Sequence, residues 1–258
     1  MRKSEVPDAM KEARAVAAFL LIIAFQTKLF AQQQDSSSSP SALTAFAKQF
    51  LEQERGLWTS PLHTKREDAK WLVPLGAGVG ALLLTDTNIS GEANETPSLR
   101  RPSRTISYAG SPVPMIAAPV ALMALGRLSN NERATRAGSI GLEAVLHSAL
   151  IVAALKTVTN RERPNKLAGD GGFWDGGKSF PSGHAMTSWA LAAAIADQYP
   201  DKKWIGITGY SVAGAISVSR VGGLNHFPSD VLIGSSLGWL IGHYVSHHSA
   251  SKNSPRKN

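Results

Sequence analysis

The chain of 258 residues has a formal net charge of +8 and contains no cysteine. Its length is enough for one sizeable domain with its own core. The lack of cysteine excludes a disulfide framework and a zinc–thiolate site. The excess of basic residues suits anionic lipids or phosphorylated substrates, and a solubilising surface explains it equally well. No long basic run interleaved with aromatic residues indicates nucleic-acid binding.

The N-terminal residues have the pattern of an export signal. Basic residues precede an apolar run at 15–25, which has the length of a signal peptide and is short for a membrane span. We predict cleavage after Ala31, with an uncleaved anchor or an ordinary helix as alternatives. Export predicts a location in the cell envelope, on the periplasmic side, either in solution or associated with the inner membrane.

The composition divides the chain into four regions. We predict an export signal peptide or anchor at 1–31, a polar linker and lead-in at 32–57, a helical-bundle domain at 58–248 and a disordered basic tail at 249–258. The domain is rich in apolar segments whose length and composition favour helices over strands. We therefore predict an all-α bundle of about six main helices. The segments lie at 71–84, 114–125, 140–155, 185–196, 204–218 and 231–245.

The sequence leaves the membrane topology open. A span needs about twenty mostly apolar residues, and these segments are shorter and contain polar groups. The mean hydropathy of the chain is slightly negative. Glycine and alanine are nevertheless common in packed membrane helices, where polar groups face the bundle interior. The composition favours an exported protein that is soluble or loosely bound to a membrane, and membrane contact stays open.

A first short motif ends the third apolar segment. Lys156 is followed seven residues later by Arg163, a spacing of about two helical turns that can point both cations the same way. Pro164 disfavours the α conformation at Arg163, so we expect the helix to end there. Two cations at a helix end can bind an anion, although basic residues there also commonly complement the helix dipole.

The second motif, PSGH at 181–184, precedes the fourth apolar segment. Ser182 is a good N-cap residue, and Gly183 lets the backbone approach a ligand closely. Amide hydrogens at such a helix start bind phosphate oxygens, and His184 falls at the mouth of the same anion site. A capped helix with an incidental histidine is the alternative.

The third motif runs from Ser219 to Asp230. Arg220 ends the fifth apolar segment, and we expect a helix to begin at Pro228, since proline is favoured at the first helical position. Asp230 then lies within reach of the His226 ring. A carboxylate that accepts a hydrogen bond from one ring nitrogen fixes the tautomer and leaves the other nitrogen free to attack. A capping aspartate beside a histidine is the simpler alternative.

Together the motifs contain three cations, two imidazoles and a carboxylate, which suits a site that holds a phosphate and attacks it with a histidine. Their order and their positions at helix ends are hard to explain by capping, so we predict the active site at the helix ends. Arg100, Arg101 and Arg104 could meet an acidic head group, but we interpret them as a solvated basic loop. We interpret His243 and His247 as a solvated helix end and predict no metal site.

The three motifs resemble those of the type 2 phosphatidic acid phosphatase/haloperoxidase superfamily, which includes acid phosphatases. They read KTVTNRERP from Lys156, PSGH from Pro181 and SRVGGLNHFPSD from Ser219, and each is complete. The resemblance implies that His226 is the nucleophile and forms a phosphohistidine, that Asp230 orients it, and that His184 protonates the leaving oxygen. It also implies that the phosphoryl oxygens are held by Lys156, Arg163, Arg220, Ser182 and Gly183.

We predict a phosphoric ester hydrolase that acts on a phosphate monoester or on a lipid phosphate or pyrophosphate. The resemblance implies no metal or other cofactor, and the three cations can do what magnesium does elsewhere. One alternative is a vanadate-dependent haloperoxidase, which the short chain disfavours and in which vanadate would be the cofactor. Another is a non-catalytic phosphate- or lipid-binding protein, against which the complete set of His184, His226 and Asp230 argues. The leaving group and the oligomeric state are not determined by the sequence.

Overall fold

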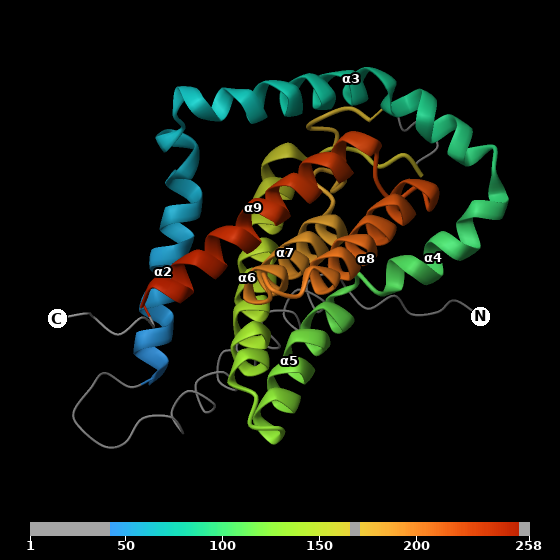
Figure 1. Ribbon diagram of the computed structural model, residues 1–258. Helices are drawn as coiled ribbons and strands as arrows, with labels where there is room; N and C mark the ends of the chain where they lie inside the picture. Colours follow the sequence, from blue (N-terminus) through green and yellow to red (C-terminus); the bar gives the residue numbers. More distant parts are fainter. Residues whose placement is uncertain (1–41, 166–170, 253–258) are drawn as a thin grey trace. The chain divides into compact units, whose positions relative to one another are not determined.

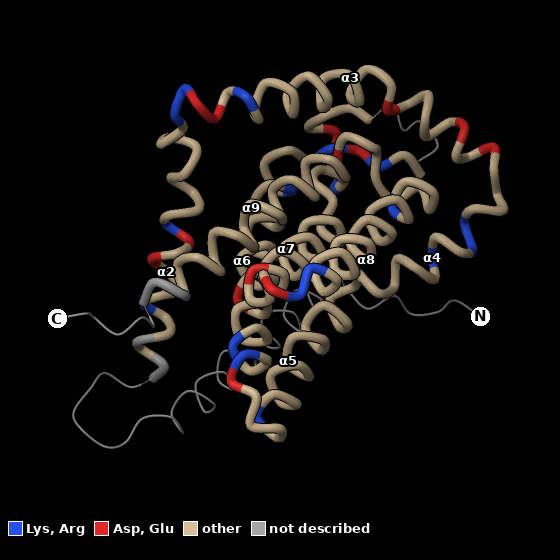
Figure 2. Tube along the Cα trace, in the orientation of Figure 1, with Lys and Arg blue, Asp and Glu red and all other residues tan. Residues whose placement is uncertain are grey.

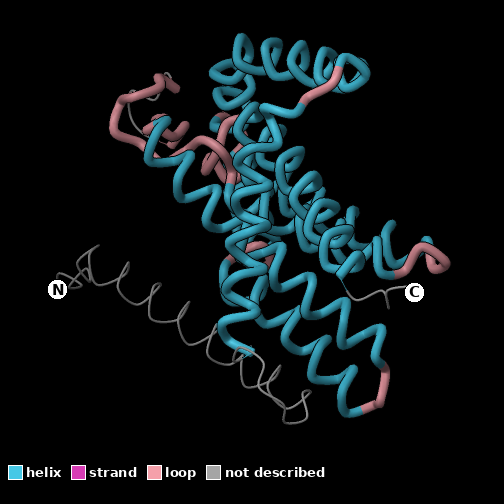
Figure 3. The backbone as a smooth tube through the Cα atoms, turned by 90° about the vertical axis from the view of Figure 1, so that its left-hand side faces the viewer, coloured by secondary structure: helices cyan, strands magenta, loops and turns pink. Residues whose placement is uncertain are grey.

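The computed structural model describes residues 42–165 and 171–252, and these residues form helices and loops without any strand (Figures 1 and 3). The predicted all-α class is confirmed. The chain forms two compact units that divide between Thr59 and Ser60. The described part of the first unit is helix α2 (Ala42–Thr59), which includes most of the predicted lead-in. The predicted export signal and the polar stretch at 32–40 lie outside the described residues.

Seven α-helices make up most of the described part of the second unit, one more than the six main helices predicted. The additional helix is α4, which occupies the region interpreted from its arginines as a solvated loop. Three short 3-10 helices, η1 (Ser60–His63), η2 (Arg66–Asp68) and η3 (Pro97–Leu99), precede α3 and α4. The seven helices are α3 (Ala69–Asn94), α4 (Arg100–Tyr108), α5 (Pro112–Leu128), α6 (Glu132–Thr159), α7 (Gly183–Gln198), α8 (Lys203–Gly222) and α9 (Pro228–Lys252).

Helix α7 lies at the centre of this unit and packs against α6, α8 and α9 (Figure 1). A core cluster of Met115, Val145 and Leu191 joins α5, α6 and α7. Two glycines of α9 bring this helix close to α7. A β-carbon at Gly234 would clash with the carbonyl oxygen of Ser182, and one at Gly238 would clash with that of Met186 in α7. The two helices that carry the second and third motifs are therefore in direct backbone proximity.

Three helical stretches are long and apolar enough to cross a membrane: Arg66–Asn94, Pro97–Leu128 and Glu132–Thr159. Only 6% of the apolar window in the first of them is buried. No charged residue occurs in α3 between Lys70 and Asp86 (Figure 2), and side chains such as Leu84, which is 84% exposed, cover its surface. Apolar surface of this extent is unfavourable in water. The chain is therefore membrane-associated. The apolar segments predicted from the sequence are too short to cross a membrane, but the helical stretches that contain three of them are longer.

Helix α6 ends at Thr159, four residues before the predicted end at Arg163. Asn160 adopts a left-handed conformation with φ of 41°, and its N–H donates to the Lys156 carbonyl at 3.1 Å. Asparagine tolerates this conformation because its short polar side chain bonds locally, here to the Thr157 carbonyl at 3.0 Å. Arg163 consequently lies in the loop that follows the helix.

Helix α9 begins at Pro228, as predicted, and is longer than predicted. Ser249, the first residue of the expected disordered tail, is buried within this helix. Its hydroxyl donates to the Glu143 carboxylate of α6 at 3.1 Å. Composition alone does not predict this contact. The predicted start of the disordered tail at residue 249 is therefore wrong, because α9 continues to Lys252. Residues 253–258 lie outside the described residues.

Candidate active site

Backbone hydrogen bonds join the three motifs at one end of the α7–α9 pair. The Ser182 N–H donates to the Asp230 carbonyl at 3.0 Å, which links the second motif to the third. The Ser179 N–H donates to the Arg161 carbonyl at 2.8 Å, which links the loop before the second motif to the first. The predicted clustering of the motifs at helix ends is thus present in the fold.

His226 and Asp230 form a buried pair at the start of α9. The side chain of His226 is 2% exposed and that of Asp230 is fully buried. The His226 Nδ1 atom lies 3.6 Å from Asp230 Oδ2. The same oxygen accepts hydrogen bonds from the Phe227 N–H at 2.9 Å and from the Ser179 hydroxyl. The carboxylate is therefore fixed beside Nδ1, and the Nε2 atom of His226 is the nitrogen available for chemistry.

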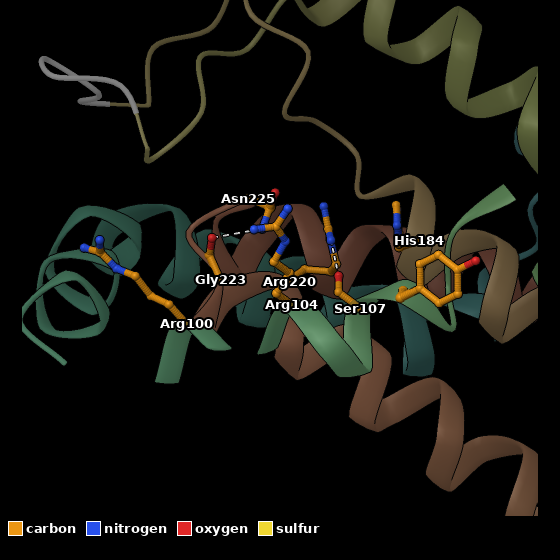
Figure 4. Close-up of a pocket in the computed structure, with 8 residues that line it drawn as sticks. Arg100, Arg104, Ser107, His184, Arg220, Gly223 and Asn225 are labelled. Carbon is orange, nitrogen blue, oxygen red and sulfur yellow. Dashed lines mark hydrogen bonds between the residues drawn. The ribbon is translucent and has the colours of Figure 1, made fainter. Parts of the chain in front are cut away.

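His184 lies in the first turn of α7, half-buried in the wall of a cavity that also contains Arg220 (Figure 4). Burial lowers the pKa of His184 to about 3. The positive charges of Arg220, His226, Lys156 and Arg163 act in the same direction. Coulomb interactions of this kind act over short distances. Both imidazoles and all three predicted cations therefore lie close to one another.

Two of the three predicted cations, Lys156 and Arg220, donate hydrogen bonds to neighbouring oxygens. The Lys156 ammonium donates to the carbonyl of Lys178 at 2.5 Å and lies 3.4 Å from the carbonyl of Ser179. Arg220 donates through Nη1 to the Ser107 hydroxyl of α4. Burial and the neighbouring Arg163 lower the pKa of Arg220 to about 10, so that this guanidinium stays charged at neutral pH.

Two buried polar atoms beside this cluster make no hydrogen bond with the described residues: the Ser182 hydroxyl oxygen and the Arg220 Nε. Ser182 occupies the N-cap position of α7, yet its side chain makes no capping bond. Buried donors are ordinarily paired, so both atoms fit an oxyanion that the surrounding cations would attract. Gly183 begins α7, and its amide belongs to the helix end that favours negative charge.

Arg161 and Asp86 also belong to the site, and neither was singled out from the sequence. Arg161 donates to Asp230 Oδ1 at 2.6 Å and to Asp86 Oδ2 at 2.7 Å, and all three side chains are at most 3% exposed. Asp86, from α3, also accepts a bond from the Ser229 N–H at 3.0 Å. A sequence signal for Asp86 existed, because a lone carboxylate within an apolar helix indicates a buried partner. Arg161 stood inside the first motif between the two predicted cations.

Arg161 is enclosed by two aromatic rings. Its guanidinium carbon lies 4.8 Å from the ring centroid of Phe173 and 4.5 Å from that of Phe227, distances typical of cation–π contacts. Burial raises the pKa of Asp230, but pairing with His226 and the charge of Arg161 outweigh it and hold this pKa below its usual value. Asp230 is therefore ionised at neutral pH and able to orient His226.

A second cluster of titratable groups, Asp197, His243 and His247, lies elsewhere in the described part of the chain. His243 Nδ1 is 2.7 Å from Asp197 Oδ2, so the carboxylate pairs with the histidine next to it. Asp197 lies near the end of α7, whereas His184 lies in its first turn. The cluster therefore takes no part in the candidate active site.

The family model of the PAP2 superfamily matches residues 138–253, which contain all three motifs. The matched residues make up a little under half of the chain. The chain is also similar to the lipid A 1-phosphatase of Porphyromonas gingivalis, with 38% identity over 65 residues. That match covers 25% of this chain and 15% of the relative, far less than two thirds of its length.

Solved structures similar to this chain include the transmembrane PAP2 type phosphatidylglycerolphosphate phosphatase from Bacillus subtilis. It shares 26% identity and a TM-score of 0.53 with this chain, over 72% of this chain and 98% of the other. Aquifex aeolicus LpxE has 22% identity and a TM-score of 0.49, over 62% and 93% of the two chains. The likeness to the transmembrane phosphatase agrees with the apolar, exposed surface of α3.

Proposed function

We propose that this chain is a lipid phosphatase of the PAP2 superfamily that removes a terminal phosphate through a phosphohistidine on His226. The observation that carries the proposal is the buried His226–Asp230 pair beside three cations and a second imidazole. The apolar, exposed α3 supports a substrate that resides in a membrane. The phosphatase activities named for the similar proteins support the same reaction class. We place the site on the periplasmic side, as the N-terminal sequence pattern predicts.

The reaction proceeds in two steps. The Nε2 atom of neutral His226 attacks phosphorus while the bond to the leaving oxygen breaks, and His184 gives that oxygen a proton. Asp230 accepts the Nδ1–H hydrogen bond and stabilises the positive charge that forms on the ring. In the second step His184 takes a proton from water, the water oxygen attacks phosphorus, and phosphate leaves His226.

The positive groups around the phosphate explain how such a reaction runs. In phosphoryl transfer negative charge spreads over the equatorial oxygens, and catalysis consists mainly of positioning and charge stabilisation. Lys156, Arg163 and Arg220 provide fixed positive charge, and the unpaired Ser182 hydroxyl and Arg220 Nε provide further donors. Each such charge-assisted hydrogen bond contributes about 1.5–3 kcal/mol. We propose that these groups suffice without a metal ion.

The activity is tested with the full chain purified in neutral detergent and given a long-chain phosphate monoester in the presence of a chelator. We expect release of inorganic phosphate that the chelator leaves unchanged and that vanadate inhibits, because vanadate adopts the five-coordinate geometry of the transition state. Failure to release phosphate at any pH, or release that requires added metal, would contradict the proposal. Peroxide-dependent halide oxidation by the vanadate-loaded protein would instead favour a haloperoxidase.

Replacing His184 with alanine is expected to lower kcat about 10²–10⁴-fold for an alkyl phosphate, the usual contribution of a general acid. The loss should be much smaller for a nitrophenyl phosphate, whose leaving oxygen needs little protonation. The comparison of kcat for the two substrates checks the role. His247→Ala, at an exposed histidine of α9, is the matched control. Equal losses on both substrates would show that His184 is no proton donor.

The rate should be greatest at mildly acidic pH. Burial lowers the pKa of His226 to about 4, with Lys156 acting in the same direction and Asp230 opposing it. Attack requires the neutral ring, so activity is lost as the pH falls through about 4. The leaving group also needs a proton from His184, which is neutral in the free enzyme in this pH range because its pKa is about 3. The bound phosphate monoester must therefore bring the proton that His184 passes on, and it carries one only below its second pKa of about 6. We expect kcat/KM to peak between these limits, and an alkaline optimum would contradict the assignment.

A further inference from the structure

Asp197, His243 and His247 bring together three possible metal ligands near the C-terminal ends of α7 and α9. Asp197 lies in the last turn of α7, and the two histidines are one turn apart on α9. One ligand atom of each side chain lies within 4.8 Å of the other two. Along α7, at 1.5 Å per residue, Asp197 is about 20 Å from His184. The cluster is thus well separated from the candidate active site.

The spacing of the three ligand atoms is close to that of a tetrahedral metal site. Asp197 Oδ2 lies 2.7 Å from His243 Nδ1 and 4.0 Å from His247 Nε2. Nitrogen and oxygen ligands lie about 2.0–2.2 Å from zinc, and therefore roughly 3.3–3.6 Å from one another. Binding an ion requires one contact to lengthen and the other to shorten by roughly half an ångström. The His247 side chain is 77% exposed, so it is free to make this adjustment and leaves the site open to solvent.

The surroundings of His243 hold its ring in place for this role. The Tyr210 hydroxyl lies 3.5 Å from Nε2, the ring nitrogen that faces away from Asp197. When a metal ion replaces the proton on Nδ1, the Nε2–H can donate to this hydroxyl, as the second nitrogen of a metal-bound histidine usually does. Trp239 packs edge-on against the imidazole, with the ring centroids 4.3 Å apart. Gly242, the preceding residue, lies so close to α7 that a β-carbon there would clash with its backbone.

We propose that Asp197, His243 and His247 bind one divalent transition-metal ion, with water as the fourth ligand. Two imidazoles and one carboxylate suit Zn²⁺, whereas Mg²⁺ and Ca²⁺ prefer oxygen ligands alone. The sequence predicts no metal site here, because Asp197 lies 46 positions before His243 and meets it only in the fold.

The ion joins α7 to α9 at the end opposite the reaction centre, and its role is structural. At the other end the two helices are already linked through the hydrogen bond from the Ser182 N–H to the Asp230 carbonyl. The ion is therefore not needed for the proposed phosphatase reaction, which proceeds in the presence of a chelator.

The test uses the full chain without a histidine tag, in neutral detergent, stripped of metal by a chelator that is then removed. Calorimetric titration with Zn²⁺ should show one ion bound per chain. The thermal midpoint should rise with Zn²⁺ concentration, because a ligand of the folded state stabilises it. We expect Tyr210→Phe to weaken Zn²⁺ binding about 10-fold, and Asp197→Asn and His247→Ala each to weaken it about 100-fold or more. Mg²⁺ should give neither signal.

His248→Ala is the matched control, because His248 is exposed, follows His247 directly and stacks its ring on Tyr244 instead of joining the cluster. Its affinity for Zn²⁺ should equal that of the wild type. The thermal midpoint in the presence of chelator shows that each variant folds, and His247→Ala should match the wild type there.

Three results would overturn the site. They are a wild-type protein that binds no Zn²⁺, Zn²⁺ binding that survives in both Asp197→Asn and His247→Ala, and Mg²⁺ binding as tight as that of Zn²⁺. Equal weakening in His248→Ala would likewise show that the cluster is not the ligand set. These measurements do not depend on phosphate release, so their outcome is independent of the phosphatase function.

Discussion

His226→Ala is expected to lower kcat/KM by roughly 10⁴–10⁶-fold, the range seen when a nucleophile is removed from a catalytic unit that acts together. The variant retains Asp230 and the cations but lacks the nitrogen that attacks phosphorus. Phosphate binding should persist, because the groups that hold the oxygens are separate side chains. Phosphate release measured over hours, together with inhibition of the residual rate by vanadate, checks both parts.

The size of this loss distinguishes a nucleophile from a residue that only binds. A binding residue replaced by alanine costs about 1.5–3 kcal/mol, or roughly 10–150-fold. Without His226 no phosphohistidine can form. The remaining rate then comes only from direct attack of water on a phosphate held by the intact cations. His226→Ala activity within 100-fold of wild type would therefore remove His226 from the role of nucleophile. His247→Ala, at the distant end of α9, should keep full activity.

Arg161→Met is expected to destabilise the protein severely, by about 3–5 kcal/mol, and to abolish activity with it. Methionine keeps much of the side-chain volume but leaves Asp86 and Asp230 buried without their cation. A buried charge that loses its partner pays the full desolvation cost, whereas the original pair offset it. The thermal midpoint of the detergent-solubilised variant should fall markedly below that of the wild type.

Arg133→Met provides the matched control for the ion pair. Arg133 pairs with Asp201, but the two side chains are 39% and 56% exposed, so water replaces the lost contact. We expect little change in its thermal midpoint. Equal shifts in Arg133→Met and Arg161→Met would show that the buried network contributes no more than a surface ion pair. Asp86→Asn, which keeps an acceptor for the Ser229 N–H, should retain more activity than Arg161→Met.

The sequence predicted the helical class and the residues of the three motifs because both depend on local patterns. Apolar runs of helical length predict helices, and short motifs at their ends place His184 and His226 beside loops. The convergence of the motifs depends on the packing of α7 against α9, to which Gly234 and Gly238 contribute. Spacing along the chain indicates that a site exists, but the contacts that complete it come from the fold.

Three features could not be predicted in this way. Asp86 meets Arg161 across 75 positions of sequence, and only tertiary packing of α3 brings them together. Helix α4 is short and rich in arginine, so its composition indicated a loop, and its helix is held by contacts with α8. Helix α6 ends at Thr159 because Asn160 adopts a left-handed conformation. The sequence predicts this end at Arg163, because Pro164 is the stronger helix-ending residue in the sequence.

Attack by His226 is tested most directly by rapid quench in alkaline detergent with a substrate labelled in its terminal phosphate. We predict radiolabel on the wild-type protein that is stable in alkali and labile in acid, as phosphohistidine is, and that maps to the peptide containing His226. The His226→Ala protein should carry no label under the same conditions. Label that is lost in alkali, or label that persists in His226→Ala, would contradict a phosphohistidine at this position.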